Sequence, residues 1–213
     1  MRGTSPEEIL EKLGAVLWRY ASDNQVRETV ENPEIDWYHR KGHKYVLYEY
    51  ELSKLAAGEE VKDFPYFTST GNVQRTTEHI LPQLPRQGEA GDCWRDVFTP
   101  EQHAALVHSL GNLVLTLDNS AYSNKCFDAK RGTSASPDSQ PAACYAQGKL
   151  HQERELAHYA TWGHDDIRTR HAALAAWMLE RWAVVAPGVE TAREDDEEHE
   201  VEEDGLDIDE VEL

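Results

Sequence analysis

Apolar residues recur every three or four positions in two N-terminal segments, a spacing that predicts amphipathic helices. The first helix is expected to begin at the sequence SPEE, where Ser5 can cap it, Pro6 fits its first turn and Glu8 completes a capping box. The second is expected over residues 43–58, with Gly58 as its stop signal. The apolar positions are Ile9, Leu13, Val16, Leu17 and Tyr20 in the first segment, and Tyr45, Tyr48, Leu52 and Leu55 in the second.

The middle of the chain changes to a different pattern. Residues 72–81 read as a strand, and the Pro/Gly-rich residues that follow are expected to be irregular. A helix is predicted to restart at Thr99, whose T-x-x-Q sequence is a capping box, and Gly111 is expected to end it. A short strand follows over residues 112–117, and then a short helix that reaches Lys130, capped by Asp118, Asn119 or Ser120. The predicted order is strand, excursion, strand, helix.

Two further helices are predicted after a loop at residues 132–143. They cover residues 145–161 and 164–185, and the second has Asp165 and Asp166 favourably placed at its N-terminus. Ile167, Leu174 and Met178 fall near one stripe of this helix. The chain is therefore predicted to be an α+β protein with a small strand–strand–helix unit inside a mainly helical domain.

Charge divides the chain into two parts. The formal net charge is −19, but the segment after residue 189 holds fourteen acidic residues and one basic residue. That segment therefore carries −13, which leaves only −6 on residues 1–189. The run from 187 to 213 has too little apolar content to order itself, so we expect a domain at 1–186 and a disordered acidic tail at 187–213.

The three cysteines are odd in number and have no CxxC spacing, which predicts neither a disulfide framework nor a thiolate zinc site. The N-terminus lacks the apolar core of a signal sequence. No apolar run approaches the roughly eighteen residues that a membrane span needs. These observations predict a cytoplasmic protein with no membrane association, and they leave its oligomeric state open.

Candidate chemistry gathers around the first predicted strand. Glu78 and His79 stand side by side just before Pro82, where the strand is expected to end, so both side chains can reach one site. Histidine can accept a proton from water near neutral pH, and carboxylate and amide oxygens suit Mg²⁺. Asn112 starts the second strand, and Asn124 precedes Lys130.

The sequences EHILPQ, HSLGNLVLTL and NSAYSNKCFDAK together resemble the three parts of an HNH endonuclease, the ββα-metal or His-Me finger. More narrowly, they resemble the C-terminal nuclease domain of GmrSD-type modification-dependent restriction systems and related phage-defence proteins. With the flanking sequences the resemblance covers roughly residues 40–182, and the finger core lies at about 73–131. It implies a metal-dependent DNA endonuclease that nicks DNA in defence against foreign or modified DNA.

The resemblance implies a role for each matching residue. His79 would be the general base, so cleavage is expected to rise with pH through about 6 to 7. Asn112 would brace the loop that bears His79, and Glu78 and Asn124 would hold Mg²⁺, or Mn²⁺, with Asn124 presented from the helix. Asn119 is the alternative to Asn124, with helix capping as its other role. His108 either lines the site or satisfies backbone groups at a helix end, and the second interpretation is preferred.

Binding partners are predicted less closely. Lys125, Lys130 and Arg131 are expected to meet DNA phosphates, with a solvated helix face as the alternative. Larger relatives carry a ParB-like nucleotide-hydrolysing domain, and this chain shows no Gly-rich phosphate loop. A separately encoded ParB-like subunit, a stand-alone nuclease and a fragment of a longer protein all remain open.

The alternative functions are an RNA nuclease and a catalytically silent interaction module of a defence complex. The acidic tail is expected to restrain DNA binding or only to keep the protein in solution.

Overall fold

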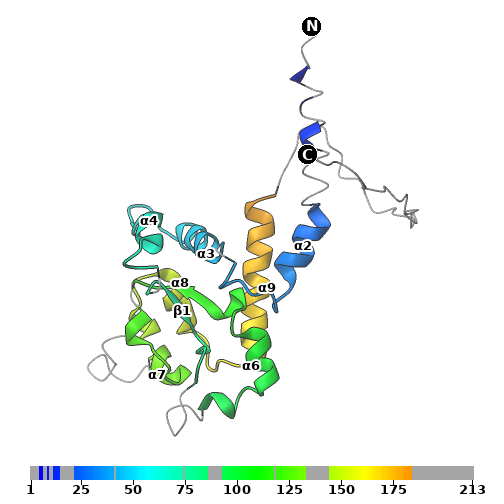
Figure 1. Cartoon of the computed structure of the whole chain (residues 1–213). Coiled ribbons are helices and arrows are strands. Elements are labelled where there is room, and N and C mark those ends of the chain that lie inside the picture. The colour runs from blue at the N-terminus through cyan, green and yellow to red at the C-terminus, as the bar shows by residue number, and fades with distance from the viewer. Residues whose placement is uncertain are drawn as a thin grey trace, which may run out of the picture. The chain divides into compact units, whose positions relative to one another are not determined.

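The computed structural model describes residues 22–40, 42–73, 75–85, 93–117, 119–132 and 144–183, together with residues 5, 6, 9 and 12–14. The compact unit ends at Trp182. Figure 1 shows short helices around a small sheet, with the long helix α9 passing beside them. In chain order the elements are α2 (Asp23–Glu31), α3 (His43–Leu52), α4 (Phe64–Thr68), β1 (Thr77–His79), α6 (Pro100–Leu106), η1 (Leu110–Asn112), β2 (Leu113–Leu115), η2 (Asn119–Ala121), α7 (Phe127–Arg131), η4 (Tyr145–Gln147), α8 (His151–Leu156) and α9 (His164–Arg181).

Strands β1 and β2 form an antiparallel pair in which Glu78 faces Val114 and His79 faces Leu113. Residues directly opposite each other in such a pair project from the same face of the sheet, and successive residues alternate between faces. Val114 belongs to one buried apolar cluster, whereas Leu113 belongs to another. The side chains of Glu78 and His79 therefore leave the sheet from opposite faces.

The strand–strand–helix order of β1, β2 and α7 matches the order predicted from the sequence, and the mixed α+β class is confirmed. The strands are shorter than expected, with three residues each. Helix α3 ends at Leu52, before the expected stop at Gly58. The helix predicted over residues 145–161 is divided into η4 and α8, with Gly148 ending η4.

Local capping signals explain where helices begin. The Thr99 hydroxyl oxygen accepts a hydrogen bond from the backbone N–H of Gln102, and the Gln102 side-chain oxygen accepts one from the Thr99 N–H, so the predicted capping box of α6 is confirmed. The same arrangement of Ser22 and Gln25 starts α2, which the apolar pattern does not predict.

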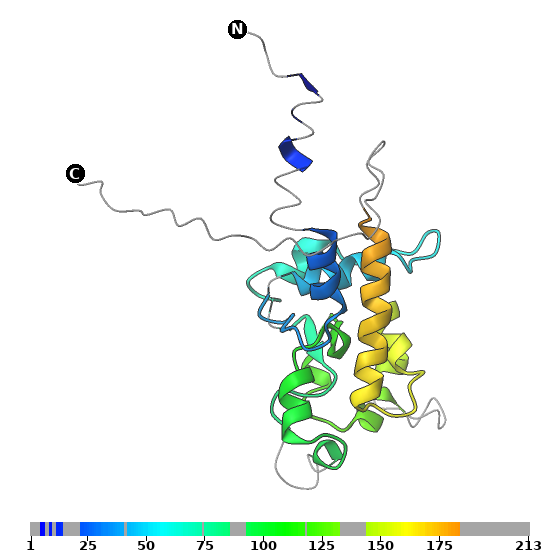
Figure 2. The ribbon, with the colours of Figure 1, turned by 90° about the vertical axis from the view of Figure 1, so that its right-hand side faces the viewer.

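Helix α9 fixes the turn that leads into β2. Ile167, Leu174 and Met178 are buried as predicted, and α9 runs beside α2 in both views (Figures 1 and 2). At Gly111 an added Cβ would lie 2.2 Å from the Ile167 carbonyl oxygen, so this close approach requires glycine. The buried Arg170 donates to the carbonyl oxygens of Leu110, Gly111 and Leu113.

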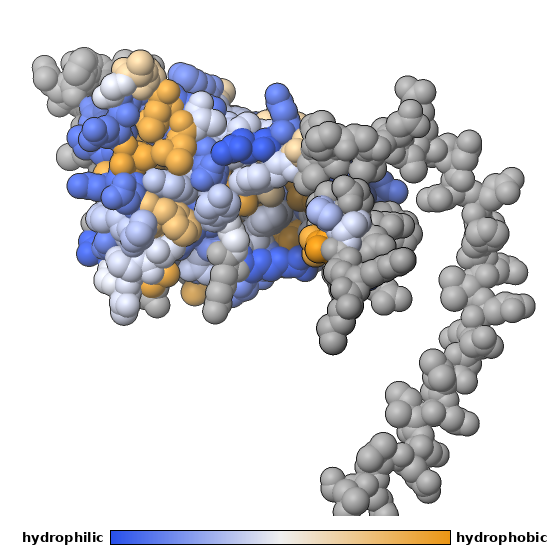
Figure 3. All heavy atoms as spheres, turned by 90° about the horizontal axis from the view of Figure 1, so that it is seen from above, coloured by the Kyte–Doolittle hydropathy of each residue, from blue (hydrophilic) through white to orange (hydrophobic). Residues whose placement is uncertain are grey.

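Several expectations fall outside the described residues. The predicted first helix does so for the most part, as do Asp118 and residues 187–213, so the division into a domain and a tail stays a prediction. In the described part, no helix is long and apolar enough to cross a bilayer. Seen from above, the described surface mixes hydrophilic areas with smaller apolar patches (Figure 3).

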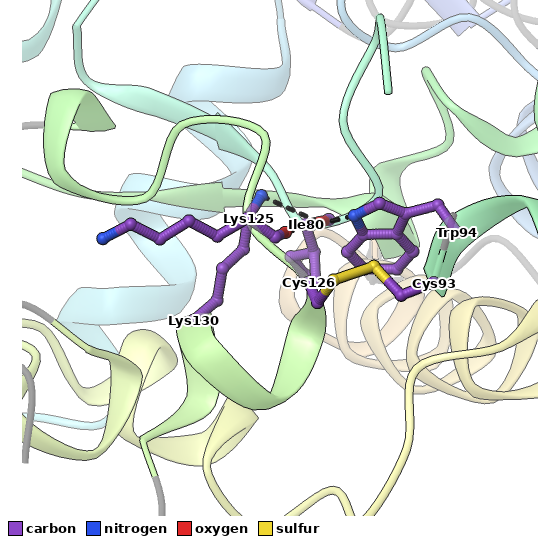
Figure 4. Close-up of a disulfide and its surroundings, with 6 residues drawn as sticks. All are labelled: Ile80, Cys93, Trp94, Lys125, Cys126 and Lys130. Carbon is purple, nitrogen blue, oxygen red and sulfur yellow. Dashed lines mark hydrogen bonds between the residues drawn. A yellow bond between two sulfur atoms is a disulfide. The ribbon is translucent and has the colours of Figure 1, made fainter. Parts of the chain in front are cut away.

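Cys93 and Cys126 form a disulfide, which corrects the expectation that no cysteines pair. The bond joins Cys93, which precedes α6, to Cys126, the cap residue at the start of α7 (Figure 4). Next to it, the Trp94 indole N–H donates to the Lys125 carbonyl at 3.1 Å. The disulfide and this hydrogen bond together hold the turn that contains Asn124 and Lys125.

Loss of the disulfide is expected to lower the free energy of unfolding by about 3 to 4 kcal/mol, because the bond closes a loop of 33 residues in the unfolded chain. Urea denaturation of the wild type and the Cys93→Ser/Cys126→Ser variant, each with and without reductant, measures this. Reductant should bring the wild type to the stability of the variant. A wild type that keeps its midpoint under full reduction would contradict the prediction.

Candidate active site

A pocket of about 330 Å³ opens where strand β1 ends. Residues of β1, of the segment that follows it and of the turn before α7 line the pocket: Glu78, His79, Pro82, Gln83, Leu84, Asn119, Ser120, Ser123 and Asn124. Glu78 and His79 start on opposite faces of the sheet but both reach this pocket, because the strand stops at His79. The structure therefore brings together the candidate base, His79, and the candidate metal ligands Glu78, Asn119 and Asn124.

The imidazole of His79 is held by its neighbours. Its Nε2 lies 3.2 Å from His108 Nδ1 and 3.3 Å from the Gln83 side-chain nitrogen. The Tyr38 ring meets it edge-on, with ring centroids 4.5 Å apart. Burial, with His108 as the next cause, lowers the pKa of His79 to about 3. The ring is thus neutral at physiological pH, in the form that can accept a proton.

Glu78 is buried beside a buried cation. Lys130 Nζ lies 2.6 Å from Glu78 Oε1 and also donates to the carbonyl oxygens of His79 and Ile80, each at 3.0 Å. The Tyr145 hydroxyl donates to the same Oε1 at 3.4 Å. Burial raises the pKa of Glu78 to about 7, although the Lys130 ammonium favours the ionised form. Lys130 therefore links the side chain of Glu78 to the backbone at His79 and Ile80.

Asn112 is fully buried, and its side chain makes four hydrogen bonds. Its amide nitrogen donates to the carbonyl oxygens of Leu81 and Val107, and its oxygen accepts from the Leu81 N–H and the Trp162 indole N–H. The Ile80 N–H also donates to the Asn112 backbone carbonyl at 3.0 Å. These are the side-chain to backbone hydrogen bonds that a bracing role for Asn112 requires.

The Asn112→Ala variant is expected to lose about 2 to 4 kcal/mol of stability, because it leaves several buried polar groups without partners. It should also loosen the segment after His79 and slow cleavage without abolishing metal binding. Chemical denaturation and metal titration by calorimetry measure both effects. The exposed Asn32, whose side chain accepts one bond from the Glu34 N–H, provides the matched control as Asn32→Ala. Equal losses in the two variants would contradict the bracing role.

Asn119 and Asn124 both line the pocket, and neither lies in α7. The Asn119 amide donates to the Thr77 carbonyl at 2.9 Å, and the Asn124 amide donates to the Leu84 carbonyl at 2.8 Å. Helix α7 begins at Phe127 with Cys126 as its cap residue, so Asn124 precedes the helix and Asn119 does not cap it. Both expectations about that helix are corrected, and the structure keeps both asparagines as candidate ligands.

Only one of the three side chains expected to meet phosphates has an exposed position. Lys130 is fully buried and bonded to Glu78, which contradicts its predicted contact with DNA. Arg131 donates to the carbonyl oxygens of Tyr159 and Ala160 and pairs with Asp128, so it is engaged within the fold. Lys125 is exposed next to Asn124 and stays a candidate phosphate contact.

Further groups around His79 were not found from the sequence. For His108 the sequence left two roles open and favoured the structural one, but the ring lies against His79 and is stacked on Tyr38. Asp36 and His39 come from the segment before α3 and lie beside His108. The D-x-x-H spacing of Asp36 and His39 was visible in the sequence, although nothing there indicated that it lies near His108.

Comparison with known protein families gives a match for this chain. The model of the C-terminal domain of GmrSD restriction endonucleases matches residues 20–177. The chain belongs to this family. The match covers β1, β2, α7 and the pocket, and it supports a nuclease of the restriction endonuclease type, for which DNA is the implied substrate. No curated protein and no solved structure matches the chain.

A divalent metal ion, which the nuclease family suggests, fits the residues of the pocket. The hard ligands that Mg²⁺ prefers are present there as the carboxylate of Glu78 and the amides of Asn119 and Asn124. The bonds from Lys130 and Tyr145 both go to Oε1 of Glu78. The pocket has space for the waters that Mg²⁺ usually keeps.

Proposed function

We propose that this GmrSD-type domain is an HNH-type, metal-dependent endonuclease that nicks DNA and acts in defence against foreign or modified DNA. The observation that carries the proposal is the meeting of neutral His79 with the oxygens of Glu78, Asn119 and Asn124 in one open pocket at the end of β1. A general base beside a set of hard metal ligands is suited to phosphodiester hydrolysis.

In this mechanism His79 accepts the proton of the attacking water. Its contacts with His108 and Gln83 fix the ring, so the base is oriented before substrate arrives. Lys130 holds the backbone at His79 and Ile80, and Asn112 holds it at Leu81, so the chain is fixed at the base and directly after it. Glu78, Asn119 and Asn124 would hold Mg²⁺, or Mn²⁺, which when bound stabilises the negative charge on the phosphate and the leaving oxygen.

A plasmid-nicking assay tests this function. Purified protein should convert supercoiled plasmid to the open circle with Mg²⁺ or Mn²⁺, and chelator should stop the reaction. Cleavage of RNA with an intact plasmid would favour an RNA nuclease. Absence of cleavage with both substrates would favour a silent interaction module.

The ligand set gives a separate prediction. Asn119→Ala and Asn124→Ala should each raise the Mg²⁺ concentration for half-maximal cleavage by about tenfold or more, because each removes one oxygen ligand. Asn32→Ala, at an exposed position, is the control. If a variant needs the same Mg²⁺ concentration for half-maximal cleavage as the wild type, the asparagine replaced in it is not a metal ligand.

Two parts of the proposal rest on the sequence and not on the geometry of the pocket. A separately encoded ParB-like nucleotide-hydrolysing subunit would regulate the nuclease, and both would act in the cytoplasm. Co-purification from the native host and cell fractionation test these two points.

A further inference from the structure

A second cluster of metal-binding side chains lies beyond the pocket, on the other side of His108. Asp36, His39 and His108 each offer a ligand atom, and these atoms all lie within 4.8 Å of one another. The first two residues come from the segment between α2 and α3, whereas His108 follows α6. No other group of this kind occurs among the residues that the structure describes.

Backbone and ring contacts hold the two segments together. The Trp37 N–H donates to the His108 carbonyl at 3.0 Å, which fastens the segment with Asp36 to the end of α6. The Tyr38 ring stacks on His108 with centroids 5.6 Å apart. The His39 N–H donates to Asp36 Oδ1 at 3.0 Å. The cluster is therefore part of the folded chain rather than a chance meeting of mobile side chains.

The donor set is different from that of the pocket. Two imidazoles and one carboxylate suit divalent transition ions such as Zn²⁺ or Co²⁺, whereas Mg²⁺ prefers oxygen ligands alone. Zinc binds imidazole nitrogen and carboxylate oxygen at about 2.0 to 2.2 Å, so the three side chains must draw closer together. The side chains of His39 and Asp36 are 66% and 46% exposed, which leaves them room to do so.

We propose that Asp36, His39 and His108 form a site for a transition metal ion, with Zn²⁺ as the best-suited ion. Three protein ligands leave a fourth position open to water or to a substrate group. The site is distinct from the oxygen-rich pocket, and it does not depend on the chain being a nuclease. A hydrogen-bonded Asp–His pair that holds no metal is the competing interpretation, because His39 Nδ1 already lies 2.7 Å from Asp36 Oδ2.

The test is a titration of the full-length, chelator-treated protein with Co²⁺ and Zn²⁺, without DNA. Excess Mg²⁺ is present throughout to occupy sites made of oxygens, including those of the acidic tail. We expect the visible absorption of nitrogen-bound Co²⁺ to appear, and Zn²⁺ to displace Co²⁺. Asp36→Asn and His39→Gln should each weaken binding at least tenfold.

Two matched variants make the test selective. His164 forms another His–carboxylate pair, with Asp165 at 2.8 Å, so His164→Gln should bind the metal as the wild type does. Asn124→Ala alters the pocket and should also keep the site, which separates this proposal from the fate of the nuclease mechanism. Asp36 and His39 are not part of the core, so circular dichroism should show folded variants. Equal binding by the wild type, Asp36→Asn and His39→Gln, or no binding under excess Mg²⁺, would overturn the proposal.

Discussion

Replacing His79 by alanine is expected to lower the single-turnover rate of DNA cleavage by about 10²- to 10⁴-fold, the usual contribution of a positioned general base. The imidazole lies in the pocket with Glu78, and burial lowers its pKa, so the ring is neutral, which is the form a general base requires. Alanine removes the proton acceptor without placing a larger group in the pocket. Quenched-flow cleavage of a labelled duplex with saturating enzyme measures the change.

The exposed His158 provides the control, because His158→Ala removes an imidazole outside the pocket lining. Both variants should give the circular dichroism spectrum of the wild type. A folded His79→Ala protein that cleaves at the wild-type rate would remove His79 from the mechanism.

The pKa of His79 also changes the expected pH dependence. The sequence alone predicted that cleavage rises through pH 6 to 7 as an ordinary imidazole loses its proton. With a pKa of about 3, His79 stays neutral across that range, so it contributes no such rise. An NMR titration of the His79 ring should show no protonation between about pH 5 and 8.

The Lys130→Met variant is expected to lose about 3 to 5 kcal/mol of stability, the usual cost of removing one partner of a buried ion pair. Lys130 is fully buried, and its ammonium bonds Glu78 and the carbonyl oxygens of His79 and Ile80. Methionine keeps the length of the stem but leaves a carboxylate and two carbonyl groups without this donor. Urea denaturation gives the free energy of unfolding.

The neighbouring lysine on the surface supplies a matched comparison. Lys125→Met should change stability by less than about 1 kcal/mol, because Lys125 is exposed. Adding Glu78→Gln to Lys130→Met should recover part of the loss, since it removes the stranded charge. If Lys130→Met and Lys125→Met unfold at the same urea concentration, the buried pair does not stabilise the fold.

The local parts of the structure were predictable because short sequence signals determine them. The capping box at Thr99 starts α6, and the apolar stripe of α9 is buried as its spacing indicates. The bonds from Asn112 to the segment after His79 were also anticipated. The Ser22–Gln25 capping box of α2 was present in the sequence and would have identified that helix.

The parts that were missed depend on contacts between distant segments. Lys130 looks like any lysine on a helix face, and only its pairing with Glu78, 52 residues away, accounts for its burial. The disulfide between Cys93 and Cys126 likewise depends on how the chain turns between them. The closeness of Asp36 to His108 follows from the packing of the segment before α3 on the end of α6.

The most direct test of the active site is a crystal structure of His79→Ala bound to a DNA duplex and Mn²⁺, with anomalous diffraction to locate the ion. The account predicts an Mn²⁺ peak in the pocket beside Glu78, Asn119 and Asn124, with a DNA phosphate next to residue 79. A DNA backbone bound elsewhere on the domain, with no metal peak in this pocket, would contradict it.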